Sequence, residues 1–362
     1  MKKKKGFLKT IILIVLIIGG ILFFIRNTEK SKLEIKKWNN IYNENNINIY
    51  YGDSENRKIK VLDDVYRVKE IVGSEENELD KVLKVADIVN EIVEFDDVAN
   101  SKKINAFDIL EEKSTLKKAS QRDMAIITRD LLLTMDIKAR VGEFKEIKKN
   151  SNEGVGYYII EYWSDEYNKW VMIDFRDKGY MEKDGIPLSA IEIISSLDKY
   201  ITYVGKIESR EYIKEFKKIL NTYTINIDNS TKMEKSNSYV TYVKDEKYIN
   251  IKLKDKYLPP TVFTENEELF NRSPLDTDIG VDEKAYIILM KKEGNEVKSE
   301  DYIVGAFKDG MIMDKYYIRE NNDDFREVTK YTEFKLEDGN NILELSIDGE
   351  NTIASIEIEY IK

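Results

Sequence analysis

The chain has 362 residues and a formal net charge of −10, and it contains neither cysteine nor histidine. This length is sufficient for two or three domains with hydrophobic cores. The composition excludes any mechanism that needs a thiolate or an imidazole, and the acidic balance argues against nucleic acid as a partner. Abundant Lys, Ile and Asn indicate an AT-rich bacterial genome.

The first 26 residues have the pattern of a membrane anchor. Residues 2–5 are all lysine, and residues 7–25 are apolar except for Lys9, Thr10 and two glycines. A helix of this length crosses the hydrocarbon core of a bilayer. A secretory signal peptide is the alternative, but no small-x-small cleavage pattern follows the apolar run. The sequence therefore predicts a single-pass cell-membrane protein whose N-terminus is cytoplasmic and whose bulk is extracytoplasmic.

The next segments are predicted from their periodicity. Residues 27–46 are polar and rich in Lys and Asn, with Trp38 and Tyr42 as isolated large anchors, which is typical of a stalk or a short helix. Residues 78–95 carry apolar side chains on one helical face and predict a largely buried helix. A second helix begins at Gln121, because apolar residues recur at three- and four-residue steps from Met124 to Met135.

A β-hairpin is predicted after this helix. Residues 155–163 and 168–175 are rich in aromatic and β-branched side chains and are separated by a short polar turn. Residues 189–192 have a helix-capping pattern, and a strand over residues 223–227 would end this domain. The central unit is therefore a helix, a strand and a hairpin within an α+β domain.

The last third of the chain has a different character. A short polar linker is followed by many short strand patterns separated by turn residues, which predict an antiparallel β-sandwich. The final two strands flank residues 348–351 and should form a hairpin. The predicted organisation is: anchor 1–26, stalk 27–46, α+β domain 47–228, linker 229–237 and β-sandwich 238–362.

Residues 78–197 resemble the transglutaminase-like superfamily. In this family, which has a papain-like α+β fold, a Cys begins the central helix, and a His and an Asp lie on the adjoining strands. Ala125 and Arg140 match the family pattern at the expected distances, Asp136-Ile137-Lys138-Ala139-Arg140 fills the step into the first strand, and the remaining matches are Glu161, Trp170 and Asp174. The resemblance implies a papain-like domain with its site at the start of the central helix.

Two decisive positions depart from the family. Gln121 stands where the nucleophilic Cys is expected, and Tyr157 stands where the His base is expected. Asp174 is retained, although Phe175 replaces the Pro that usually follows it. A thiolate-imidazole mechanism needs both missing groups. The resemblance therefore implies a pseudoenzyme without a catalytic residue.

The degenerate site still has groups that can bind a ligand. The candidates are Gln121, Arg122, Tyr157, Glu161 and Asp174. Asp174, without an imidazole to orient, is interpreted as a hydrogen-bond acceptor for Tyr157 or Arg122. No pattern predicts a metal or a cofactor.

Three functions follow from these observations. The first is a membrane-anchored, inactive transglutaminase-like protein that binds a cell-envelope glycan, a peptide, or a membrane or secreted protein. The alternative is a purely structural assembly component that acts through the C-terminal β-sandwich. The second alternative is a hydrolase that uses Glu161 and Asp174 as an acid-base pair.

Overall fold

The computed structural model describes residues 32–146, 156–196, 200–251, 258–276, 279–291, 298 and 300–362. The predicted membrane-spanning segment, residues 7–25, lies outside these ranges. Within them, no helix combines the length and the apolar character needed to cross a bilayer.

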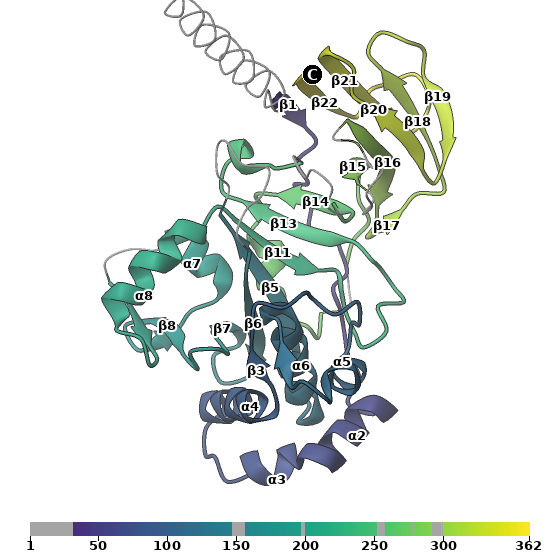
Figure 1. The fold of residues 1–362 in the computed structure, drawn as a ribbon. Coiled ribbons are helices and arrows are strands. Elements are labelled where there is room, and N and C mark those ends of the chain that lie inside the picture. The colour runs from purple at the N-terminus through teal and green to yellow at the C-terminus, as the bar shows by residue number, and fades with distance from the viewer. Residues whose placement is uncertain are drawn as a thin grey trace, which may run out of the picture.

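A six-stranded sheet lies at the centre of the molecule (Figure 1). Its strands, in spatial order, are β14 (Thr261–Thr264), β13 (Tyr239–Val243), β11 (Thr222–Asn226), β5 (Ala139–Lys145), β6 (Gly156–Ser164) and β7 (Lys169–Ile173). Neighbours are antiparallel except for β13 and β14, which are parallel. The predicted hairpin is the β6–β7 pair.

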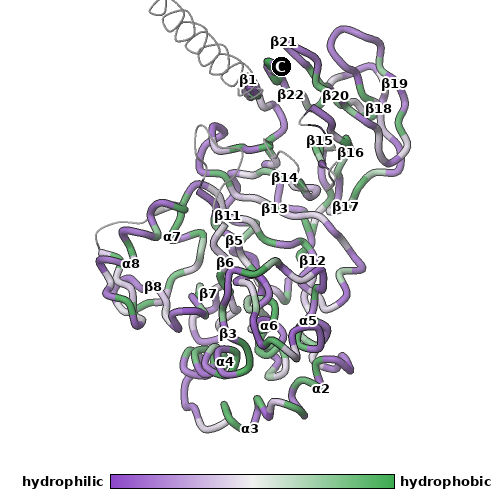
Figure 2. Tube along the Cα trace, viewed as in Figure 1, coloured by the Kyte–Doolittle hydropathy of each residue, from purple (hydrophilic) through white to green (hydrophobic). Residues whose placement is uncertain are grey.

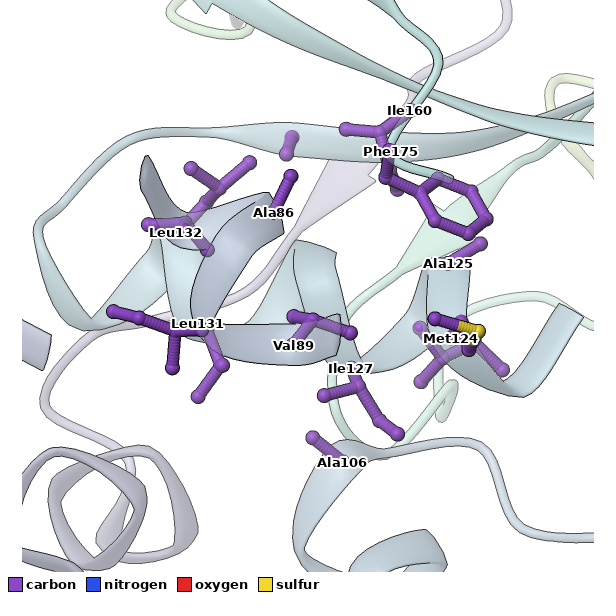
Figure 3. Packing of buried hydrophobic residues seen from close by; sticks show 14 of the residues in the cluster. Ala86, Val89, Ala106, Met124, Ala125, Ile127, Leu131, Leu132, Ile160 and Phe175 are labelled. Carbon is purple, nitrogen blue, oxygen red and sulfur yellow. The ribbon is translucent and has the colours of Figure 1, made fainter. Parts of the chain in front are cut away.

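Five helices pack on one face of this sheet. They are α2 (Arg57–Tyr66), α3 (Val68–Val72), α4 (Glu78–Ile92), α5 (Ala106–Lys113) and α6 (Gln121–Thr134). Every residue of α6 from Asp123 onward is buried. Figure 2 shows apolar residues, in green, along α4 and α6. Figure 3 shows how Val89 of α4 and Ile127 of α6 share one core with Ile160 of β6.

The opposite face of the sheet is also covered. Here lie α7 (Ala190–Ser196), α8 (Ser209–Phe216), the short helix η1 (Lys217–Ile219) and a small sheet of β10 (Ile201–Val204), β8 (Tyr180–Lys183) and β9 (Ile186–Pro187). Alternation along β6 places Tyr157 and Ile159 on this face, and Tyr158 and Ile160 on the α6 face. The sheet is therefore buried on both sides.

Two further antiparallel sheets form the C-terminal part. The first contains β1 (Lys32–Asn39), β22 (Ala354–Ile361), β21 (Gly339–Ser346), β18 (Lys315–Glu320) and β19 (Arg326–Thr329). The second contains β15 (Tyr286–Met290), β16 (Asp301–Lys308), β17 (Met311–Ile312) and β20 (Thr332–Lys335). Apolar side chains of both form one core. The predicted α+β class and the C-terminal antiparallel structure are confirmed.

Short elements complete the fold. β2 (Tyr50–Tyr51) pairs with β12 (Asp228–Asn229), and β3 (Glu94–Phe95) pairs with β4 (Lys118–Ala119), in both cases in parallel. The helices η2 (Glu246–Tyr248) and α9 (Glu268–Asn271) lie between later strands. The β3–β4 pair matters for the site, because it brings Phe95 next to the start of α6.

The structure differs from the predicted stalk of residues 27–46. Residues 32–39 form β1, which pairs antiparallel with the final strand β22. Trp38 and Tyr42, interpreted as isolated anchors, are buried at 4% and 0% exposure. The Lys-rich composition did not predict this strand, because its alternation is interrupted by a bulge. Leu33, Ile35 and Trp38 face the core, and the charged residues between them face solvent.

The predicted boundary between residues 237 and 238 also falls in the wrong place. β13 and β14 follow this boundary in sequence, yet they extend the central sheet beyond β11. Asp228 and Asn229, at the predicted linker, are buried and form β12. The central sheet gains these strands because β11 offers a free edge, and hydrogen bonding to β13 satisfies its backbone groups.

Candidate functional site at the start of helix α6

The first turn of α6 is the exposed end of an otherwise buried helix. Ser120 caps it, since its hydroxyl accepts a hydrogen bond from the Asp123 amide at 3.2 Å. Gln121 and Arg122 follow and are partly exposed. The sequence thus folds so that the position of the expected nucleophile faces solvent at the N-terminus of the helix.

Two side-chain hydrogen bonds involve the predicted positions Gln121, Tyr157 and Asp174. The Gln121 side-chain amide donates to the Tyr158 carbonyl oxygen at 3.0 Å, which joins the start of α6 to β6. The Tyr157 hydroxyl donates to Asp174 Oδ2 at 2.5 Å, which joins β6 to the residue after β7. These two bonds link the helix start to the first strand of the hairpin, and that strand to the end of the second.

Asp174 is fully buried and acts as an acceptor. Its carboxylate oxygens accept hydrogen bonds from the hydroxyls of Tyr157 (2.5 Å) and Tyr212 (2.8 Å) and from the backbone amides of Arg176 (3.1 Å) and Asp177 (3.4 Å). Of the two hydrogen-bond donors that the sequence suggested for Asp174, Tyr157 donates to it and Arg122 does not. With its lone pairs occupied in this way, the carboxylate holds the site together and is not available to a substrate.

Tyr157 is fixed by aromatic neighbours as well as by Asp174. Its ring lies edge-on to Phe216 at 5.7 Å, and Phe216 stacks on Tyr212, which stacks in turn on Tyr203 at 3.5 Å between ring centroids. Burial, and then the charge of Asp174, raise the pKa of Tyr157 above the usual range of a phenol. Tyr157 therefore remains protonated near neutral pH and cannot accept a proton as the expected His would.

These tyrosines predict a stability change at high pH. Burial raises the pKa of Tyr212 as well as that of Tyr157, whereas tyrosines of the unfolded chain ionise near pH ~10. Above that pH, unfolding releases protons from these tyrosines, so the free energy of unfolding falls as the pH rises. Below that pH, these tyrosines do not change the free energy of unfolding. Each group contributes a slope of about 1.4 kcal/mol per pH unit. Urea unfolding between pH 9 and 11 of Tyr157→Phe/Tyr212→Phe should give a shallower decline than wild type, and an equal slope would contradict the assignment.

Glu161 is absent from the site although it shares a sheet face with Tyr157. It lies four strand positions away, about 13 Å along β6, and is fully buried. Its carboxylate accepts hydrogen bonds from Arg140 (2.8 Å), Tyr223 (2.6 Å) and the Ala190 amide (2.8 Å). Arg140 in turn lies over the Trp170 ring at 4.1 Å. Glu161 therefore has a structural role, and its carboxylate and that of Asp174 are each occupied by a separate set of donors.

Arg122 points away from Tyr157 and Asp174. Its guanidinium donates to the carbonyl oxygens of Ser101 (3.0 Å) and Lys103 (3.4 Å). It also lines a cavity of about 60 Å³ together with Glu143, Tyr158 and Tyr239. This volume holds a few water molecules, so Arg122 is at the margin of the site and its main contacts are within the protein.

The structure adds residues that the sequence did not indicate. The Arg176 guanidinium carbon lies 4.5 Å from the Phe95 ring and 5.3 Å from the Tyr157 ring. Phe95, which is 42% exposed, is next to the helix start because it pairs with Ala119. No periodicity or motif connects Phe95 with Arg176, since the contact depends on the β3–β4 pairing.

A second cavity lies at the other end of α6. It has a volume of about 550 Å³, and its lining includes Lys69, Lys81, Lys138, Glu78, Trp163 and Leu275. Lys138 donates to the Gly52 carbonyl oxygen, and Glu78 accepts from Ser164. Within the described ranges, no group of three or more acidic side chains has a geometry that could hold a metal ion.

Comparisons with known proteins do not assign the chain to a family. No family model matches the chain, and no curated protein matches it. Among solved structures, the chain is similar to a candidate cysteine protease from Cytophaga hutchinsonii, whose crystal structure extends to 1.9 Å. The two share 23% sequence identity with a TM-score of 0.25, and the match covers 31% of this chain and 37% of that protein. The chain thus matches little more than a third of that protein's length, and it has no cysteine for a papain-like catalytic site.

Proposed function

We propose that this chain is a catalytically inactive, transglutaminase-like protein that is anchored in the cell membrane through residues 7–25. Outside the membrane it binds a cell-envelope glycan, a peptide or a protein with the surface around Gln121. The observation that carries the proposal is that Gln121, at the start of α6, bonds to β6 at the Tyr158 carbonyl, while the neighbouring Tyr157 bonds to Asp174 after β7.

The chemistry of these groups supports inactivity. A carboxamide is not a nucleophile, and a partly buried phenol with a raised pKa does not take up a proton at neutral pH. A chain without any cysteine or histidine cannot supply the missing pair from elsewhere. The hydrolase alternative has no support from geometry, because Glu161 and Asp174 are both buried and occupied by other donors.

The exposure and the rigidity of the surface around Gln121 support binding. Gln121 and Tyr157 are partly exposed, and Phe95 beside them is 42% exposed. All three belong to elements that are fixed by strand pairing, by the buried helix α6 or by the Asp174 hydrogen bonds. A surface held in this way loses little conformational entropy when a ligand binds.

Site-specific photo-crosslinking in cells tests this proposal. A crosslinking residue at Phe95 should capture a defined glycan, peptide or protein, identified by mass spectrometry. Tyr331 is a matched control, because it is an aromatic residue of similar exposure, 45%, next to β20 in the C-terminal sheets. Capture from position 331 alone would instead favour the structural assembly role, and absence of capture from position 95 would contradict the proposal.

A point substitution is preferable to a deletion for this purpose. Removing residues 228–362 would take away β13 and β14 of the central sheet and the partner strand of β1. Loss of binding in such a variant would not distinguish a missing surface from an unfolded domain.

A further inference from the structure

The backbone around Arg176 is fixed on both sides. Phe175, which stands in place of the family's Pro, points into the α6 core near Ala125 and Ile160 (Figure 3). Its carbonyl oxygen accepts a hydrogen bond from the Asn90 side chain at 3.1 Å. The Arg176 amide donates to Asp174 at 3.1 Å. Arg176 is thus held at a defined place at the end of the hairpin.

The side chain of Arg176 is held by two aromatic rings. Its guanidinium contacts Phe95 at 4.5 Å and Tyr157 at 5.3 Å, both within the range of a cation–π interaction. We call Phe95, Tyr157 and Arg176 the aromatic clamp. Phe95 pairs with Ala119, directly before the cap of α6. The aromatic clamp therefore lies beside Gln121.

The guanidinium in the aromatic clamp has no acceptor among the residues that the structure describes. It makes no ion pair or hydrogen bond with them, although most other arginines of the chain do. The nearest acids in sequence are occupied: Asp174 accepts from two tyrosines, and Asp177 accepts from the Tyr203 hydroxyl and two backbone amides. A guanidinium carries five N–H donors, and the partly exposed Arg176 can offer them to another molecule.

The charges nearby indicate which anion fits. A guanidinium binds carboxylates and phosphates in the same paired geometry. Here the single positive charge of Arg176 lies between Asp174 and Asp177 in the sequence, and the backbone amides of Arg176 and Asp177 donate to the Asp174 carboxylate. A phosphate group carries nearly two negative charges at neutral pH and would be opposed by these acids. A carboxylate carries one negative charge and matches the single guanidinium.

We propose that Arg176 binds the carboxylate group of the ligand, with the rings of Phe95 and Tyr157 holding the guanidinium in its binding position. This inference rests on the proposed function, since it names the chemistry recognised by the same surface. The carboxylate belongs to a chain terminus or to an acidic side chain of a peptide.

Peptide binding to the full-length protein tests the inference. The probes are three pools of fluorescent tetrapeptides: one with a free terminal carboxylate, one amidated at that end, and one amidated but carrying a single aspartate. Fluorescence anisotropy should detect binding of the first or the third pool and not of the second. Which of the two binds distinguishes a terminal from a side-chain carboxylate.

Substitutions then assign the binding to Arg176. Arg176→Gln should weaken binding about 10- to 100-fold, because it removes a charge-assisted pair of hydrogen bonds. Arg176→Lys keeps the charge but loses the planar fork, and should weaken binding several-fold. Arg57→Gln is the matched control, since Arg57 is exposed at the start of α2, away from the aromatic clamp. Circular dichroism checks that each variant is folded.

Other outcomes separate this inference from the proposed function. Equal binding by wild type and Arg176→Gln, stronger competition by inorganic phosphate than by acetate, or no binding of any pool would each overturn the carboxylate assignment. In those cases, a ligand captured from position 95 would still support the proposed function. Failure of that crosslinking would remove the proposed function itself.

Discussion

Replacing Glu161 with glutamine is expected to lower the free energy of unfolding by about 3–5 kcal/mol. Arg140 is 1% exposed and has Glu161 as its charged partner, at 2.6 Å. One of its nitrogens already lacks a hydrogen-bond partner among the described residues. Without the carboxylate, the guanidinium would be a buried charge that only a carbonyl oxygen, Trp170 and neutral groups surround.

Urea denaturation of wild type and Glu161→Gln measures this loss. Glu215→Gln is the matched control, because Glu215 pairs with Lys218 on the surface, where both side chains are more than half exposed. Such a solvent-exposed pair contributes little to stability. A loss in Glu161→Gln as small as that in the control would mean that the buried pair does not stabilise the fold.

Trp38→Ala is expected to have an effect of similar size, about 3–5 kcal/mol. Trp38 lies on β1 with 4% exposure, and its ring packs edge-on against Phe263 of β14 at 5.5 Å. It therefore joins the C-terminal sheets to the central sheet. Its indole nitrogen has no hydrogen-bond partner among the described residues, so the loss would come from packing.

The same substitution tests the structure against the predicted stalk. In a stalk, removing one aromatic ring would change stability little. Lys37→Ala, one residue earlier on the exposed side of β1, is the control and should stay within about 0.5 kcal/mol of wild type. A Trp38→Ala variant as stable as this control would contradict the burial of β1.

Periodicity was sufficient where an element is stabilised by its own pattern. The helix predicted over residues 78–95 is α4, Glu78–Ile92, and the predicted hairpin is the β6–β7 pair. The final hairpin is β21–β22. In each case the apolar side chains repeat at the period of the element and face one core.

Sequence reasoning failed where a strand depends on a distant partner. The pattern of β13 predicts a strand but does not say which sheet it joins, and β1 finds its partner at the other end of the chain. The prediction of the site is limited in the same way. Spacing within the hairpin led to Tyr157 and Asp174, whereas Phe95 and Arg176 meet only after strands distant in sequence have paired.

The pairing of β1 with β22 has a mechanical consequence. Lys32 lies opposite Ile361, so both ends of the described chain lie at the same end of the β1–β22 strand pair. If residues 7–25 anchor the protein as proposed, a pull from the membrane enters along β1. The hydrogen bonds of an antiparallel ladder are perpendicular to its strands, and β22 returns to the body from the far end of the ladder. The load is then shared by all of these bonds as shear, so that β1 resists the pull as one unit.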